Sequence, residues 1–187
     1  MTHLPVGKFD IIYTDPPWPR EKGGIRKSRP NQKRSLDYKT MSLDDIFKLH
    51  HAVMESNCNN PHAVFMWAID KFLIETCDTM NRLGYKLHAR IIWNKLNGVA
   101  PAFTVRYTHE YLLWFYYPKM IPIDKSQRGK WTTVLEEKST SHSRKPEIAY
   151  TFIESVYPLK SKLEMYARNT RNGWESWGDE LDLADSV

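Results

Sequence analysis

The sequence has little cysteine and no long apolar run. Only two of its 187 residues are cysteines, Cys58 and Cys77, and both fall in segments with helical character. No apolar run approaches the roughly 20 residues that a membrane-spanning helix needs. No signal peptide or internal repeat is apparent. With two thiols and no targeting segment, we expect an intracellular, cytoplasmic protein without membrane contact.

Metal-binding patterns are also missing. The seven histidines show none of the spacings that are typical of a zinc site. His50 and His51 are adjacent, so on a helix their side chains would point in different directions. We therefore predict no metal centre.

What is present is the composition of an ordinary globular protein, with 41% hydrophobic and 26% charged residues. A chain of this length can bury one substantial core but not two, so residues 1–187 are expected to form a single domain. Aromatic residues make up 13% of the chain. Most should build the core, and some are expected to stack on nucleic-acid bases.

Positive charge is concentrated in the segment 19–40. The formal net charge is +5, and this segment contains Gly23, Gly24 and Pro30. Between Arg20 and Arg34 it has seven cations and a single acid, Glu21. A connection of this length is either functional or disordered. We expect it to close over nucleic acid, the alternative being a merely solubilising loop. The seven cations between Arg20 and Arg34, which would contact the nucleic acid, are Arg20, Lys22, Arg26, Lys27, Arg29, Lys33 and Arg34.

Strand-like and helix-like patterns alternate along the chain. Helices are expected after the caps Ser42 and Asp70 and from Pro146, and Gly84 and Pro158 should end the last two. Such alternation is typical of an α/β fold, a mainly parallel sheet with helices on both faces and its ligand at the carboxyl ends of the strands. The predicted strands cover 9–14, 62–68, 87–93, 110–117, 131–135 and 163–167.

The first strand stops at Asp15-Pro16-Pro17-Trp18. Two prolines make the backbone rigid and leave their carbonyls free, because neither nitrogen can donate a hydrogen bond. The carboxylate and these carbonyls can accept from an exocyclic amine, and the flat ring can stack on a base. For two prolines alone, a stiff surface turn would be the simpler interpretation. The flanking acid and aromatic favour a site for a planar amine.

This stretch, residues 7–18, resembles the catalytic motif of the MT-A70 family of adenine-N6 methyltransferases. The resemblance continues at residues 143–147 and 162–168 and closes at 173–181, so it spans nearly the full chain. The catalytic motif comes first and the cofactor motif last, which is the permuted order of the family. The resemblance implies a Rossmann-like class I methyltransferase fold. It also implies S-adenosylmethionine as methyl donor, with S-adenosylhomocysteine as product.

The resemblance further implies roles for single residues. The catalytic centre would comprise Asp15, Pro16, Pro17 and Trp18, and Lys145 would hold the methionine carboxylate of the cofactor. Three alternatives stay open: a solvated helix-end lysine at 145, a Glu164 that only neutralises Arg168, and a merely charged tail at 179–180. Cofactor contacts would come from Asp15, Lys145, Glu164, Arg168, Thr170, Asp179 and Glu180.

Two features depart from the family pattern. Only residues 1–6 precede the matching stretch, where family members usually have a segment that helps to hold the cofactor adenine. Thr170 and Arg171 stand where some relatives have a His-Asn pair. We expect these departures to affect cofactor affinity more than catalysis.

The leading hypothesis is methyl transfer to the N6 amino group of adenine in DNA. The same reaction on RNA is an alternative, because both partners are polyanions. Cytosine-N4 methylation is disfavoured, since that specificity more often accompanies a serine in place of Asp15. A non-catalytic subunit is disfavoured because such subunits typically lose the acidic motif. No separate target-recognition domain is visible, so we expect loose specificity or help from a second copy or a partner subunit.

Overall fold

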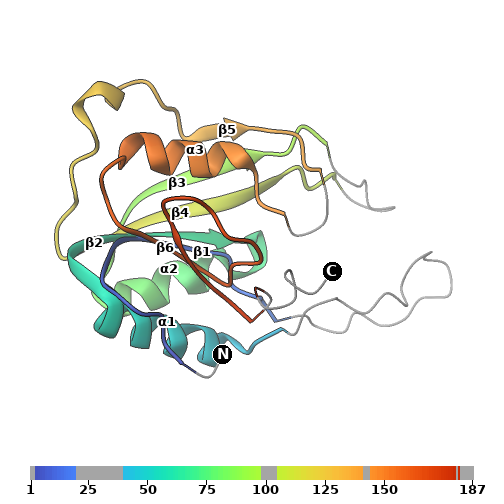
Figure 1. Ribbon diagram of the computed structural model, residues 1–187. Helices are drawn as coiled ribbons and strands as arrows, with labels where there is room; N and C mark the ends of the chain where they lie inside the picture. Colours follow the sequence, from blue (N-terminus) through green and yellow to red (C-terminus); the bar gives the residue numbers. More distant parts are fainter. Residues whose placement is uncertain (1–2, 20–39, 98–104, 141–143, 180, 182–187) are drawn as a thin grey trace, which may run out of the picture.

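The computed structural model describes residues 3–19, 40–97, 105–140, 144–179 and 181. These residues form a seven-stranded sheet with helices on both faces (Figure 1). The strands are β1 (Phe9–Thr14), β2 (Cys58–Ala68), β3 (Lys86–Asn94), β4 (His109–Tyr117), β5 (Val134–Glu136), β6 (Lys162–Met165) and β7 (Glu175–Trp177). The helices are α1 (Leu43–Asn57), α2 (Leu73–Arg82) and α3 (Glu147–Val156), with short 3₁₀ turns at Asp70–Phe72 and Lys125–Gln127.

The sheet has the strand order β5-β3-β4-β2-β1-β6-β7. β1 pairs in parallel with β2 and β6, β6 with β7, and β3 with β5. β4 is antiparallel to both β2 and β3. The expected α/β fold is confirmed, with β4 as the exception to the parallel direction. β4 can pair in this way because it directly follows β3 along the chain, whereas parallel neighbours need a crossover connection.

Both faces of the central strands are buried. Successive side chains of a strand point to opposite faces, so Ile11 and Tyr13 pack with α3 while Ile12 packs with α1 and α2. Figure 1 shows α3 on one face and the other two helices opposite. The residues 62–68 of β2 are buried throughout, as the near-continuous apolar run predicts.

The first helix begins where the sequence predicts, and the second ends there. The predicted start of the second helix is wrong, because Asp70 opens a 3₁₀ turn and α2 itself begins at Leu73 without a side-chain cap. The Ser42 hydroxyl accepts a hydrogen bond from the Asp45 backbone N–H at 3.1 Å and so caps α1. Gly84, just beyond α2, has a φ of +87°, a conformation that glycine adopts without steric cost.

The third helix begins differently. Pro146 was expected at the first helical position, but it is the extended residue before α3, with a φ of −70° and a ψ of 145°. The Glu137 carboxylate supplies the cap. Its oxygens accept from the backbone N–H groups of Glu147 at 2.8 Å and Ile148 at 2.7 Å. A carboxylate here also interacts favourably with the helix dipole.

Three local expectations are corrected. Cys58 is the first residue of β2 and not part of a helix, although Cys77 does lie in α2. β5 is shorter than the expected strand 131–135 and shifted toward its end. The turn-rich tail contains the additional strand β7. A Cβ on Gly178 would lie 2.3 Å from the Ala167 carbonyl oxygen, so only glycine permits this close approach to the segment after β6.

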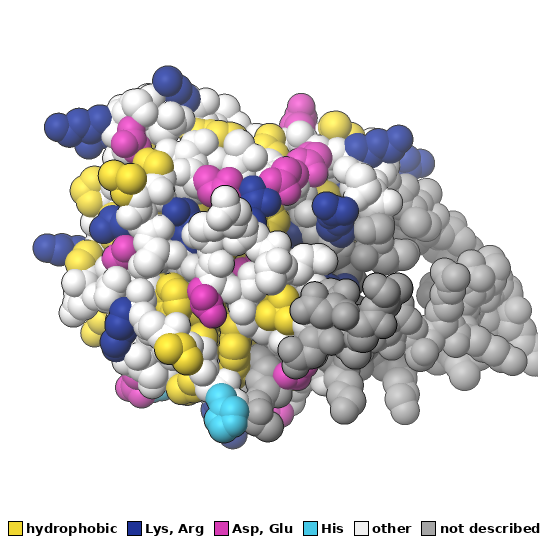
Figure 2. Space-filling model, viewed as in Figure 1, with side chains coloured by type: hydrophobic (Ala, Val, Ile, Leu, Met, Phe, Trp, Pro, Cys, Tyr) yellow, Lys and Arg dark blue, Asp and Glu magenta, His cyan; other side chains and the backbone are white. Residues whose placement is uncertain are grey.

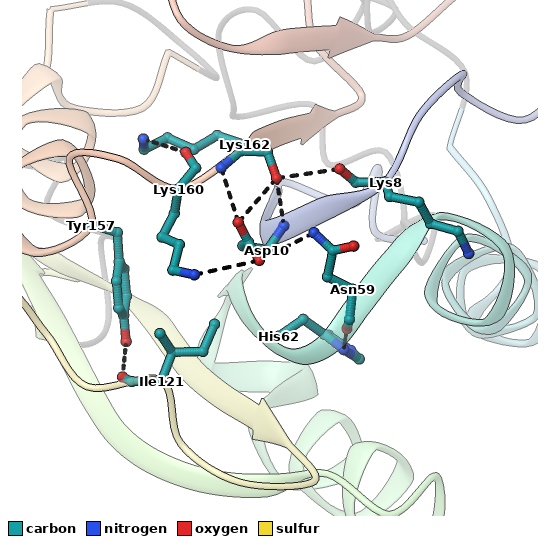
Figure 3. A network of polar contacts seen from close by, with 9 residues as sticks. Lys8, Asp10, Asn59, His62, Ile121, Tyr157, Lys160 and Lys162 are labelled. Carbon is teal, nitrogen blue, oxygen red and sulfur yellow. Dashed lines mark hydrogen bonds and ion pairs between the residues drawn. The ribbon is translucent and has the colours of Figure 1, made fainter.

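A polar network joins the amino ends of β1 and β6 (Figure 3). The Asp10 carboxylate accepts from the Asn59 side chain at 3.1 Å and from the Ser161 backbone N–H and hydroxyl at 3.2 Å each. Lys160 Nζ lies 3.7 Å from the same carboxylate. Asp10 therefore ties three segments of the chain together at this edge.

Within the described residues, no helix is long and apolar enough to cross a membrane. The same residues contain no group of three or more His, Cys, Asp or Glu side chains placed to hold a metal ion.

Candidate active site

A cavity of about 440 Å³ opens at the carboxyl ends of β1 and β6, beside the start of α3. Figure 2 shows acidic and basic side chains interspersed on the face over α3. The carboxyl ends of parallel strands are where ligands bind in open α/β sheets. The cavity is lined by Tyr13, Asp15, Arg144, Lys145, Glu147, Tyr150, Glu164, Tyr166, Arg168, Asn169, Thr170 and Arg171.

Lys145 lies between two carboxylates. Its Nζ atom is 3.0 Å from Asp15 Oδ1 and 3.0 Å from Glu110 Oε2. The same atom lies 5.4 Å from the centroid of the Trp67 ring, within the range of a cation–π interaction. Glu110 pairs in addition with Lys95. Only 13% of the Lys145 side chain is exposed, so it is not a solvated helix-end lysine.

Burial and neighbouring charges have opposite effects on the pKa values of Asp15, Lys145 and Glu110. Burial raises the pKa of Asp15 above its usual value, and the neighbouring Lys145 offsets only part of that effect. Burial alone would lower the pKa of Lys145, but the two carboxylates raise it, so the amine is charged. For Glu110, burial acts to raise the pKa, but Lys145 and Lys95 together lower it. Lys145 thus stabilises two partly buried carboxylates at once.

The turn after β1 is tightly hydrogen-bonded. The Pro16 carbonyl accepts from the Trp18 backbone N–H at 2.8 Å, and the Pro17 carbonyl accepts from the Met41 N–H at 2.9 Å. A carbonyl oxygen has two lone pairs, so Pro16 retains one acceptor position. The Trp18 ring stacks on Phe72, with the centroids 5.3 Å apart and the planes 23° apart. Trp18 does not line the cavity.

A buried histidine, His50, contacts the residue that precedes this turn. His50 Nδ1 lies 2.7 Å from the Ile46 carbonyl oxygen and therefore carries the proton, since a carbonyl can only accept. His50 Nε2 then accepts from the Thr14 hydroxyl at 2.8 Å. Burial lowers the pKa of His50 to about 4, so the ring is neutral near pH 7. The bond holds Thr14, the residue directly before Asp15.

Glu164 projects from β6 into the cavity. Its Oε1 accepts from the Tyr150 hydroxyl at 2.7 Å, and the Tyr150 ring lies 4.8 Å from that of Tyr13. Burial raises the pKa of Glu164, and the bond from Tyr150 lowers it in part. The next residue but one, Tyr166, has a φ of 62°. This conformation is unusual for an aromatic residue and is typical of strained functional segments.

The structure brings five of the expected cofactor residues to one cavity: Asp15, Lys145, Glu164, Arg168 and Thr170. Asp179 is described but does not line it. Glu180 lies outside the described residues, as do the seven cations between Arg20 and Arg34. Their expected roles remain predictions.

Other residues of the site carry no local sequence signal. Glu110 begins an apolar strand, and Lys95 follows another, yet both join the ion chain around Lys145. Tyr150 lies three residues after Glu147 on α3, and this helical spacing is the only pattern that could have placed both at one cavity.

The residues of the cavity are suited to a nucleoside-type cofactor. Its volume falls within the about 300–1,000 Å³ of typical ligand pockets. Carboxylates such as Glu164 can accept from ribose hydroxyls, and the basic side chains can bind a carboxylate. The Tyr166 hydroxyl is buried without a hydrogen-bond partner within the described segments.

A mixed sheet with helices on both faces and a polar cavity at its strand ends is typical of Rossmann-like α/β folds, which bind small ligands at this position. The sequence model of the MT-A70 family matches residues 9–180, and the chain belongs to this family. MT-A70 methyltransferases use S-adenosylmethionine as methyl donor.

Individual relatives cover most of the chain. A Medicago truncatula protein described as MT-A70-like is 28% identical over 181 residues, which is 94% of this chain. The type II methyltransferase M.MunI of Mycoplasma sp is 26% identical over 95% of the chain, and the human N(6)-adenosine-methyltransferase catalytic subunit METTL3 is 25% identical over 95%. The matched region spans 27% of the Medicago protein, 29% of METTL3 and 80% of M.MunI.

Proposed function

We propose that this chain transfers a methyl group from S-adenosylmethionine to the N6 amino group of adenine in DNA. The observation that carries this proposal is the placement of Asp15. Its carboxylate lies at the cavity edge, directly before a rigid turn, and its ion partner Lys145 is fixed by Glu110. A hydrogen-bond acceptor for a planar amine therefore adjoins the cavity suited to the cofactor.

The chemistry of the amine determines what these residues must do. Its lone pair is delocalised into the adenine ring, so the nitrogen is a poor nucleophile until it becomes tetrahedral. Asp15 and the remaining lone pair of the Pro16 carbonyl accept its two N–H groups and stabilise the positive charge that develops. The resulting ammonium is acidic enough to lose its proton to water, so no strong general base is required. A base in a duplex must be flipped out to reach this turn.

S-adenosylmethionine supplies an electrophilic methyl group when it is bound. Glu164 would accept from the ribose hydroxyls, and Arg168 and Thr170 would contact the same part of the cofactor. Lys145 donates two of its three hydrogens to Asp15 and Glu110, which leaves one for the cofactor carboxylate. The proximity and fixed orientation of the cofactor and the adenine amine would contribute much of the rate acceleration.

The choice of DNA rests on M.MunI. The name type II methyltransferase denotes modification of DNA, and the match covers 80% of that protein. METTL3 and the Medicago protein are named for N(6)-adenosine methylation, and this chain corresponds to less than a third of each. RNA is therefore the second candidate substrate, and the cations of segment 19–40 would serve either one.

Methylation of matched DNA and RNA oligonucleotides with labelled cofactor tests the proposal. We expect N6-methyladenine in the nucleoside digest of the DNA and none with Asp15→Ala. Methylated adenosine from RNA alone would transfer the proposal to RNA. Label in cytosine would contradict the base assignment. No product from either polymer, with cofactor binding intact, would support a non-catalytic subunit.

A further inference from the structure

Arg171 connects the segment after β6 with α3. Its Nε and one terminal nitrogen lie 2.6 Å and 3.0 Å from the two carboxylate oxygens of Glu154. A terminal nitrogen also lies 2.6 Å from Glu147 Oε1. The Trp174 indole N–H donates to Glu154 at 2.7 Å. Two acids of α3 thus bind one guanidinium from the following loop.

The same guanidinium covers a ring in the cavity wall. The Arg171 Cζ atom lies 4.4 Å from the centroid of Tyr150, close enough for stacking and a cation–π interaction. The Tyr150 hydroxyl donates to Glu164, and all three residues line the cavity. The contacts therefore run without interruption from the outer acid Glu154 to the acid inside the cavity.

The electrostatics agree with this geometry. The bond to Glu154 is the largest of the contributions that raise the pKa of Arg171, and the reciprocal bond lowers the pKa of Glu154. Only an arginine has donors in a planar fork that can bind one carboxylate through two bonds and also stack on a ring. A lysine at this position would keep the charge and lose the fork.

We propose that Arg171 is a positioning residue for cofactor binding, because it holds residues 168–170 and the Tyr150 ring in place through Glu154 and Glu147. The inference rests on the proposed assignment of the cavity to S-adenosylmethionine. Residues 168–170 form no part of a helix or strand, so their position depends on such side-chain contacts. Partly exposed ion pairs contribute little to global stability, and the loss should therefore appear in cofactor affinity.

A double-mutant cycle on the full chain tests the inference. The variants are Arg171→Ala, Glu154→Gln and the combination, with Arg171→Lys to separate charge from fork geometry. Calorimetry measures S-adenosylhomocysteine affinity, which needs no nucleic acid, and thermal unfolding monitors the fold. Glu164→Gln reports on the cavity assignment. Lys160→Ala breaks an ion pair at the opposite end of β1 and is the control.

We expect Arg171→Ala and Arg171→Lys to weaken binding by about tenfold, with kcat at saturating cofactor nearly unchanged. The combination with Glu154→Gln should be no weaker than Arg171→Ala alone, because the two act through one contact. Two results would overturn the positioning role. One is a double variant whose loss of affinity equals the sum of the two single losses. The other is an affinity of the Arg171 variants within twofold of wild type while Glu164→Gln binds the cofactor more weakly. Unchanged affinity in Glu164→Gln as well would instead overturn the cavity assignment.

Discussion

β1 carries an aspartate at each end, and the two have opposite surroundings. Asp10, at the amino end, accepts from an amide side chain, a backbone N–H and a hydroxyl, with Lys160 further away (Figure 3). Asp15, just past the carboxyl end, has its ion pair with Lys145 and opens onto the cavity. One carboxylate accepts from three neutral donors, and the other is held by a cation at the edge of a cavity.

The same residue type therefore has two different surroundings, one that joins segments of the chain at Asp10 and one that borders a cavity at Asp15. Neutral donors can satisfy a carboxylate fully, which joins segments but leaves nothing for a ligand. At Asp15 a lysine shared with Glu110 offsets part of the effect by which burial raises the pKa, and the carboxylate borders the cavity. Four predictions, from the largest expected effect to the smallest, test this contrast.

Exchanging each aspartate for alanine should give opposite outcomes. Asp15→Ala should lower kcat by about 100- to 1,000-fold while the fold persists, because the loss falls on the transition state. Asp10→Ala should lower stability by about 1–3 kcal/mol, through unpaired donors, and spare kcat. Steady-state kinetics and denaturant unfolding measure both. Comparable activity of wild type and Asp15→Ala would remove this residue from the catalytic centre.

The neutral His50 behind Asp15 should make stability depend on pH. Its folded pKa of about 4 lies below the ordinary histidine value of 6.5, so the unfolded chain binds the proton more readily. The contribution of neutral His50 to the free energy of unfolding is on the order of 3 kcal/mol. It is fully present above pH 6.5 and declines as the pH falls toward 4.

His50→Gln should accordingly flatten the rise of unfolding free energy across this window, measured by urea titration at several pH values. The exposed neighbour His51→Gln is the matched control and should follow wild type. An unchanged slope in His50→Gln would mean that other groups carry the pH dependence.

Removal of Lys145 should act mainly on the cofactor. Lys145→Ala is expected to weaken S-adenosylmethionine binding by roughly 1.5–3 kcal/mol, because a charge-assisted bond is lost. It also leaves Asp15 and Glu110 without their shared cation. Calorimetry measures the affinity, with Lys160→Ala at the amino end for comparison. Equal affinity in both variants would show that the cofactor carboxylate is held elsewhere.

The smallest effect concerns the cations of segment 19–40, which lie outside the described residues. A triple variant with Ala at Arg26, Lys27 and Arg29 should bind nucleic acid with a weaker dependence on salt. The slope of log K against log salt concentration should fall by about one unit per lost phosphate contact, with cofactor affinity unchanged. The control is a second triple variant, which also removes three positive charges but in the segment between β4 and β5. It has Ala in place of Lys125, Arg128 and Lys130. Identical slopes for the two triple variants would exclude a specific role for the basic loop.

Much of the fold follows from local patterns in the sequence. Apolar runs located the strands except β7, and caps such as Ser42 and Gly84 marked helix ends, because side-chain periodicity and backbone preference act over a few residues. The rigid turn at residues 15–18 was equally visible, since proline restricts its own backbone and that of its neighbour. Five expected cofactor residues meet at one cavity because strand ends converge at one edge of such a sheet.

Only the tertiary structure decided which distant groups meet. The direction of β4 brings Glu110 to Lys145, and the return of the chain after β6 brings Arg171 to Glu154. In the same way, the distant Glu137 caps α3 by accepting from the backbone N–H groups of Glu147 and Ile148. These contacts depend on strand order and direction, which no local pattern specifies. The sequence determined by itself most of the elements and the rigid turn at residues 15–18, and long-range packing determined the ion partners that surround this turn.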